Sequence, residues 1–198
     1  MKTKQVYICY RHPDNGGCIP NINIVRSIVQ QIKLISPCYK VVISEPKFSE
    51  ITSKQIESSN YFICILTHDT LHKCNTPTDP VRQEISLAHK YGVKFIYINP
   101  DNQFNNDCYP VDFPKELDFI KTNHHITIHM DSSFERDMKA LAKNELGWID
   151  ISNKSIFYIM IITFICLAIT FFLHWKWGLL TYILGIGFWG YFLSSSND

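Results

Sequence analysis

The stretch Asp79–Ala88, with the sequence DPVRQEISLA, predicts the first turns of a helix that follows a buried strand at Tyr61–Leu66. Asp79 is suited to cap this helix, and Pro80 would occupy the first helical position, where a missing N–H costs nothing. Apolar residues recur at helical spacing, so one face of the helix is expected to pack on a sheet. The same stretch places Glu84 near the mouth of the crevice beyond the carboxyl ends of the strands, where ligands bind in open α/β sheets.

Outward from this stretch, short apolar runs rich in β-forming residues alternate with helical patterns. Strands are predicted at Val6–Tyr10, Tyr39–Ser44, Tyr61–Leu66, Val93–Ile98 and, as a weaker edge strand, His125–His129. Helices are predicted from Asn21 or Asn23 to Ile35, over Lys54–Ser58, from Asp79 to a left-handed stop at Gly92, around Glu116–Lys121, and after the capping-box spacing of Ser132–Glu135. Five strands separated by helices predict an α/β fold with a parallel sheet covered on both faces, and we expect a flavodoxin-like strand order.

The composition argues against several classes of protein and site. The 198 residues carry a formal net charge of +1 with scattered bases, which does not favour nucleic acid as a partner. Seven cysteines include no C-x-x-C pair; Cys9 and Cys64 fall in apolar strands and Cys166 in an apolar helix. His124 and His125 lack further ligands at metal-binding spacing and are expected at a strand edge. Neither a metal site nor a disulfide framework is therefore predicted.

The chain changes character after Asp150. Residues 155–173 are apolar almost without interruption, which is long enough to cross a bilayer, and a polar break at 174–177 separates them from a second apolar run, at about 178–193. We therefore expect a folded domain at 1–148, a linker at 149–154 and a transmembrane helical hairpin in 155–198. The alternative is one membrane helix followed by a buried or interfacial tail.

The lysines around the apolar runs predict the orientation of the hairpin. Lys139, Lys143 and Lys154 precede the first run, whereas Lys176 stands alone in the break. The folded domain and the C-terminus are therefore expected on the cytoplasmic side of a cell membrane. Glycines in and beside the second run favour close helix contact and self-association, at positions Gly178, Gly185, Gly187 and Gly190.

Four segments of the folded part, taken in order and spacing, carry a resemblance to a known family. They are VYICYRHPDNGG (6–17), YFICILT (61–67), LHKC (71–74) and DPVRQEI (79–85). Through them, roughly residues 5–147 resemble the TIR (Toll/interleukin-1 receptor) domain family, and within it the NAD-cleaving branch. The resemblance implies cleavage of NAD⁺, as substrate and not cofactor, at the nicotinamide–ribose bond, with Glu84 as the catalytic carboxylate. One carboxylate beside the ribose can stabilise the oxocarbenium-like state of such a reaction.

The resemblance also implies a set of substrate-binding residues. Arg11 and His12 match the paired basic positions after the first strand, where family members meet the phosphates or the nicotinamide end, and Tyr10 lies at the same rim. Glu45 stands in the loop after the second strand, where the family carries an aspartate, and Phe48 of that loop could stack on a base. Without the resemblance, Arg11 and His12 are loop-end cations and Phe48 is a buried side chain.

The chain departs from the family pattern at several positions. Pro80 stands four residues before Glu84, where the family has tryptophan, His12 replaces an arginine, and the loop containing Glu45 has no glycine before Ile56. These departures leave the carboxylate in place but bear on how the substrate lies and how copies assemble. Read by itself, Glu84 would be a solvated residue near the positive end of the helix dipole.

Three functions are consistent with these features. The first is a membrane-anchored TIR NADase that clustering activates, with a sensor or activator protein in trans, in a bacterial anti-phage or abortive-infection system; its product is ADP-ribose or a cyclised or base-exchanged form. The second is a TIR signalling scaffold without catalysis. The third is a membrane-disrupting effector in which the TIR domain drives oligomerisation of the hairpin.

Overall fold

A computed structural model of the chain describes residues 4–35, 38–147, 161–165 and 171. The chain divides into two units, Met1–Trp148 and Ile149–Asp198. In the second unit the described residues are helical. The predicted hairpin therefore lies almost wholly outside the described residues. Where the structure describes the chain, it contains no helix with the length and apolar character needed to cross a membrane.

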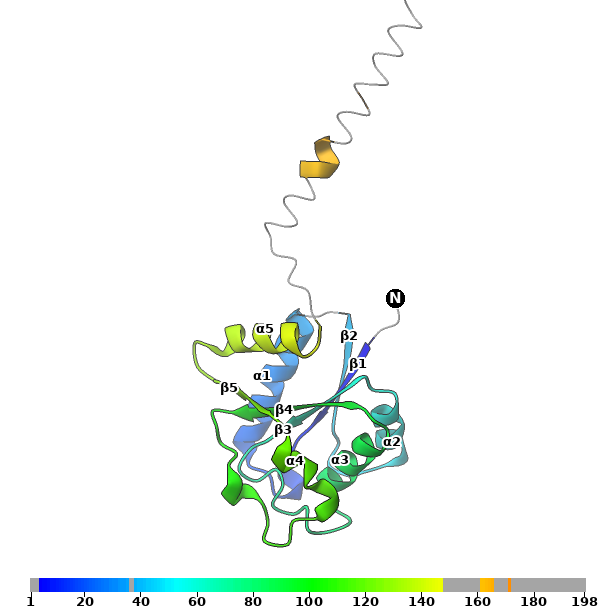
Figure 1. Ribbon diagram of the computed structural model, residues 1–198, viewed down its shortest axis with the longest axis vertical. Helices are drawn as coiled ribbons and strands as arrows, with labels where there is room; N and C mark the ends of the chain where they lie inside the picture. The colour runs from blue at the N-terminus through cyan, green and yellow to red at the C-terminus, as the bar shows by residue number, and fades with distance from the viewer. Residues whose placement is uncertain (1–3, 36–37, 148–160, 166–170, 172–198) are drawn as a thin grey trace, which may run out of the picture. The chain divides into compact units, whose positions relative to one another are not determined.

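A five-stranded parallel sheet forms the centre of the first unit (Figure 1). The strand order is β2-β1-β3-β4-β5, and every neighbouring pair is parallel. This is the flavodoxin-like order, so the predicted fold class and strand order are confirmed. The strands are β1 (Lys4–Cys9), β2 (Tyr39–Ile43), β3 (Tyr61–Ile65), β4 (Lys94–Pro100) and β5 (His125–Ile128).

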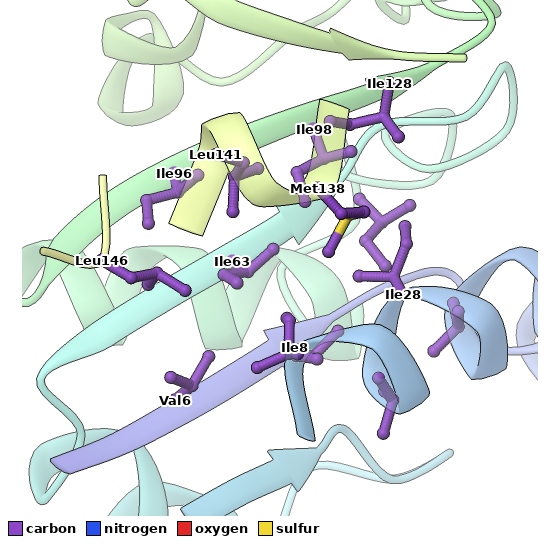
Figure 2. Packing of buried hydrophobic residues seen from close by; sticks show 14 of the residues in the cluster. Val6, Ile8, Ile28, Ile63, Ile96, Ile98, Ile128, Met138, Leu141 and Leu146 are labelled. Atoms are coloured by element: carbon purple, nitrogen blue, oxygen red, sulfur yellow. The ribbon is translucent and has the colours of Figure 1, made fainter. Parts of the chain in front are cut away.

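Helices cover both faces of the sheet, and each face has its own buried core. On one face, α1 (Ile19–Ile35) and α5 (Phe134–Asn144) pack on isoleucines of β1, β3 and β4, which Figure 2 shows together with Met138 and Leu141 of α5. On the other face, α2 (Glu50–Glu57) and α3 (Pro80–Lys90) cover a second core, which also receives Leu117 and Ile120 from the shorter helices η3 (Lys115–Leu117) and α4 (Phe119–Thr122).

The alternation of side chains along β1 decides which residues reach which face. Val6, Ile8 and Tyr10 belong to the core under α1 and α5, whereas Tyr7 and Cys9 belong to the core under α2 and α3. β1 is flanked on both edges by other strands, and Tyr7 and Cys9 are wholly buried. The α3 face of β1 therefore carries two polar groups into the interior.

Two helices begin earlier than predicted. α2 starts at Glu50 and not Lys54, because Ser49 caps it by accepting a hydrogen bond from the Thr52 amide at 3.2 Å. α1 starts at Ile19, so Asn21 lies inside the helix and not at its cap. The start of α2 is therefore set by a side-chain hydrogen bond, while Asn21 of α1 donates instead to Thr67 and Asp69.

The other predicted ends had mixed outcomes. Gly92 follows α3 with φ +66°, so the left-handed stop is confirmed. The capping box predicted over Ser132–Glu135 is wrong: the residue before α5 is Ser133 and not Ser132, its side chain makes no capping hydrogen bond, and its amide donates to Asp131 Oδ1 at 2.7 Å. The helix expected around Glu116–Lys121 is split into η3 and α4.

Candidate active site

Glu84 lies in the second turn of α3 with its side chain turned into the protein. The helix begins as predicted, since Asp79 caps it by accepting from the Arg82 amide at 3.1 Å and Pro80 is its first residue. The apolar residues Val81, Ile85 and Ala88 are buried against the sheet as expected. Glu84 itself is only 1% exposed. The interpretation of Glu84 as a solvated surface residue is therefore wrong, because its carboxyl is buried beside Tyr7 and Cys9 of β1.

The Glu84 carboxyl is buried beside β1 without complete hydrogen bonding. Burial raises the pKa of Glu84 to about 8, and the hydrogen-bonding groups of Cys9 and then Tyr7 act in the opposite direction. Glu84 Oε2 has no hydrogen-bond partner among the described residues, and neither has Tyr7 Oη. At neutral pH the carboxyl is therefore mostly protonated in this closed arrangement.

Arg11 is wholly buried and paired with Asp79. Its Nη1 contacts Asp79 Oδ1, its Nη2 donates to Asp79 Oδ2 at 3.0 Å, and Nε and Nη2 donate to the Thr70 carbonyl at 3.1 and 2.8 Å. Burial acts to lower the pKa of the Arg11 guanidinium, but the hydrogen bonds and charge of Asp79 outweigh it, so the pKa is raised. Because Asp79 also caps α3, this pair fixes the start of the helix that carries Glu84.

The structure does not bring the remaining predicted residues together around Glu84. Tyr10 lies in the core under α1 and α5, on the opposite face of the sheet from α3. His12 is half-buried and caps the short helix that follows it. Glu45 is exposed, and Phe48 is half-buried against the core under α2 and α3. Among the predicted substrate-binding residues, Phe48 is therefore the one that packs on the core beneath α3, next to which Glu84 is buried.

The sequence interpretation missed a buried polar network after β3. Asp69 accepts hydrogen bonds from the Cys18 amide at 2.6 Å, the Asn21 side chain at 2.8 Å and the Thr67 hydroxyl at 2.7 Å. Burial acts to raise the pKa of Asp69, but the hydrogen bonds from Thr67 and Cys18 outweigh it and lower the pKa. The run Thr67–Thr70 was the available signal, since Thr and Asp just after a strand favour local side-chain turns. The network ties the start of α1 to the end of β3.

Tyr7 and Cys9 were also missed as neighbours of Glu84. Both stand in a run of apolar strand residues, and period-two alternation places both on one face of β1. That signal could have identified which polar groups the strand offers to a packed helix, but not which helix residue lies opposite them. The α3–β1 packing, which depends on long-range contacts, supplies that pairing.

The described part of the chain holds no group of three His, Cys, Asp or Glu side chains arranged to bind a metal ion. His125 Nε2 lies 3.1 Å from the Ile120 carbonyl, which engages one of the two predicted strand-edge histidines within the fold.

No protein-family model and no curated protein matches the sequence. Among solved structures, the chain is similar to the TIR domains in "Structure of the activated Roq1 resistosome directly recognizing the pathogen effector XopQ". The identity is 10%, the match covers 79% of this chain and 97% of that chain, and the TM-score is 0.37. A TM-score this low supports no inference, so the fold assignment rests on the strand order and register of the sheet.

Proposed function

We propose that this chain is a membrane-anchored NAD⁺ glycohydrolase of the TIR type, with Glu84 as its catalytic carboxylate and clustering of copies as its activation. The observation that carries the proposal is the state of Glu84, which is 1% exposed, has an unpartnered Oε2 and has a pKa raised by burial to about 8. A buried acid with a perturbed pKa, near the ligand-binding edge of an open α/β sheet, is typical of a functional group. The sequence resemblance suggests the reaction.

The proposed chemistry requires one carboxylate and no general acid. The bond between ribose C1′ and the nicotinamide nitrogen breaks, and its electron pair leaves with nicotinamide as a neutral base. Positive charge develops on the ribose, where ionised Glu84 would stabilise it. Water then adds to C1′ and releases a proton, which gives ADP-ribose, nicotinamide and H⁺. A cyclised or base-exchanged product results when another nucleophile takes the place of water.

The raised pKa of Glu84 is compatible with the charge of this substrate. In the closed protein, a carboxyl with a pKa of about 8 is mostly neutral at pH 7. The nicotinamide ring of NAD⁺ is positively charged, and a cation placed beside a carboxyl favours its ionised form. Binding of NAD⁺ would therefore generate the carboxylate that the reaction uses.

Substrate can reach Glu84 only after the protein opens, because Glu84 and the neighbouring Tyr7 are buried. Phe48, in the segment between β2 and α2, packs half-buried on the same core. Displacement of this segment when copies cluster would uncover the carboxyl. A single copy would then be inactive, as the clustering hypothesis requires.

The membrane anchor, the cytoplasmic side, the activator in trans and the bacterial anti-phage setting enter the proposal from the sequence alone. The apolar runs at 155–173 and 178–193 support anchoring, and their glycines support contact between copies. An anchored domain confined to the membrane plane clusters at lower bulk concentration than a free one. Depletion of NAD⁺ would then halt the infected cell.

One observation favours a second candidate, the TIR signalling scaffold. Glu84 is covered and Arg11 is wholly buried in its pair with Asp79, so neither offers a polar atom to a ligand in this arrangement. A scaffold needs only the outer surfaces of the domain. The two candidates differ in whether clustered protein consumes NAD⁺.

The deciding experiment is NAD⁺ turnover by the full chain in detergent, fused to an inducible dimerisation domain. We expect nicotinamide release on clustering, loss of release in Glu84→Gln, and a mass-spectrometric product of ADP-ribose or a cyclised form. Glu57→Gln is the matched control, since Glu57 is an exposed glutamate on α2. Clustered wild-type protein that leaves NAD⁺ intact would reject the enzyme in favour of the scaffold.

A further inference from the structure

Two side chains of β1, Tyr7 and Cys9, lie on the face of the sheet that α3 covers, and both are 0% exposed. Both carry a hydrogen-bond donor into a core made mostly of apolar side chains. Burial and then the Glu84 charge raise the pKa of Tyr7, while burial, Cys64 and Glu84 raise the pKa of Cys9. Both shifts favour the protonated groups, which are hydrogen-bond donors.

We propose that Tyr7 and Cys9 are positioning residues, which donate hydrogen bonds to the Glu84 carboxyl and so orient it and favour its ionised form during the reaction. This inference rests on the proposed function of Glu84. In this proposal α3 carries the Glu84 carboxyl, and β1 supplies the donors that orient it and favour its ionised form.

The bonding capacity of the groups supports this assignment. Tyr7 Oη and Glu84 Oε2 are both buried and both without a hydrogen-bond partner among the described residues. A buried unpaired donor and a buried unpaired acceptor each carry a desolvation penalty, which is relieved when they bond to each other. The Tyr7 ring is stacked on Phe62 of the neighbouring strand, with centroids 5.5 Å apart and planes 12° from parallel. This stacking fixes the direction of the hydroxyl.

The charged groups around Glu84 act in opposite directions on its pKa, so we assign the stabilisation of its ionised form to the hydrogen-bond donors of β1. Asp79 at the start of α3 acts to raise the pKa of Glu84, and Arg11 at the end of β1 acts to lower it. Because Arg11 and Asp79 are paired with each other, their effects oppose one another. Cys64 of β3 acts to raise the pKa of Cys9, and Glu45, after β2, acts to raise the pKa of Tyr7. The charged side chains of α2 are all exposed, namely Glu50, Lys54 and Glu57.

The test is the protonation of Glu84 itself, followed by carbon NMR of the full chain in detergent with glutamate labelled at the carboxyl carbon. Glu84→Gln identifies the resonance by its loss. We expect Tyr7→Phe and Cys9→Ala each to raise the titration midpoint of Glu84 by about one pH unit, a tenfold loss of ionised Glu84 at pH 7, as for one hydrogen bond to a charged group. Tyr7→Phe keeps the ring and its stacking, so the fold is expected to persist.

Tyr97→Phe is the matched control. Tyr97 is 2% exposed, belongs to the same core and also has a buried hydroxyl without a partner among the described residues. The titratable groups that act on its pKa are Cys64, Tyr109 and Cys9, and not Glu84. We expect its removal to leave the Glu84 midpoint unchanged. A general loosening of the core would move the midpoint in this variant as well, and would overturn the proposal.

Activity provides an independent measurement. If clustered protein cleaves NAD⁺, the acid limb of kcat against pH should move upward in Tyr7→Phe and Cys9→Ala with the NMR midpoint, and not in Tyr97→Phe. A Glu84 midpoint unchanged in both β1 variants overturns the positioning role, whatever the activity. Wild-type protein without turnover rejects the proposed function, while the NMR midpoints still decide whether Tyr7 and Cys9 act on Glu84.

Discussion

Replacing Glu84 by glutamine is predicted to stabilise the protein at neutral pH, because glutamine fills the same space and cannot ionise. Burial raises the pKa of Glu84 from its ordinary value of 4.5 to about 8, so the folded state prefers the neutral acid. Below pH 4.5 the group is protonated in both states and carries no penalty. As the pH rises from 4.5 to 8 the unfolded chain ionises first, and stability is lost. Above pH 8 the penalty is constant.

The size of the effect follows from the shift. Each unit of pKa difference corresponds to about 1.4 kcal/mol. The gain in free energy of unfolding for Glu84→Gln is then about 1 kcal/mol at pH 5, about 3 kcal/mol at pH 7 and about 4 kcal/mol at pH 8. Glu84 is 1% exposed, so solvent screening does not reduce these values.

The assay is urea unfolding of the full chain in detergent, followed by circular dichroism at these three pH values. The control Glu57→Gln changes an exposed carboxylate and should alter stability by less than about 0.5 kcal/mol at each pH. The reasoning is refuted if Glu84→Gln is neutral or destabilising at pH 7, or if its effect does not grow between pH 5 and pH 8.

Three further predictions concern the frame around Glu84, each measured as a free energy of unfolding. Arg11→Met should cost about 3–5 kcal/mol, because it leaves Asp79 buried and unpaired, and a matching Asp79→Leu in the same chain should recover part of the loss. Gly17→Ala should destabilise more than Gly92→Ala: a Cβ at Gly17 would lie 2.2 Å from the Arg11 carbonyl oxygen, whereas Gly92, with φ +66°, meets only backbone strain of about 1 kcal/mol. Asp69→Asn should cost about 1–3 kcal/mol above pH 4 and progressively less as the pH falls through the lowered pKa of the wild-type carboxylate.

Hydrophobic periodicity was sufficient to predict the sheet. The runs at Val6–Tyr10, Tyr61–Leu66 and Val93–Ile98 are too apolar to face solvent on either side, which indicates central parallel strands. The weaker alternation at His125–His129 predicted an edge strand, and β5 lies at an edge. Helix starts were less predictable, because Ser49 and Asn21 take their roles from hydrogen bonds whose geometry depends on the folded chain.

The sequence was sufficient to predict that Glu84 lies on α3, but not that its side chain is buried. Helical spacing puts Glu84 one residue from the buried Ile85 and three from Val81, at the border of the apolar stripe. Whether a border residue turns outward or inward depends on what the helix packs against, here Tyr7 and Cys9 of β1. Likewise, the position of Arg11 just after a strand suggests a cation that is open to ligands. In the structure, Arg11 is instead paired with Asp79, which lies far from it in the sequence.

The burial of Glu84 is compatible with a scaffold, and its ionisation penalty is what the proposed enzyme would require. A scaffold gains nothing from an ionisable side chain in this core, since glutamine or methionine would occupy the space without an ionisation penalty of about 3 kcal/mol at pH 7. A catalytic carboxyl, in contrast, must be held where desolvation strengthens its interaction with developing charge, and functional groups of this kind commonly reduce stability. If Glu84→Gln both stabilises the protein and abolishes NAD⁺ turnover, the carboxyl is needed for catalysis and not for stability. Stabilisation together with unchanged signalling and no turnover would instead make Glu84 a tolerated buried acid in a scaffold.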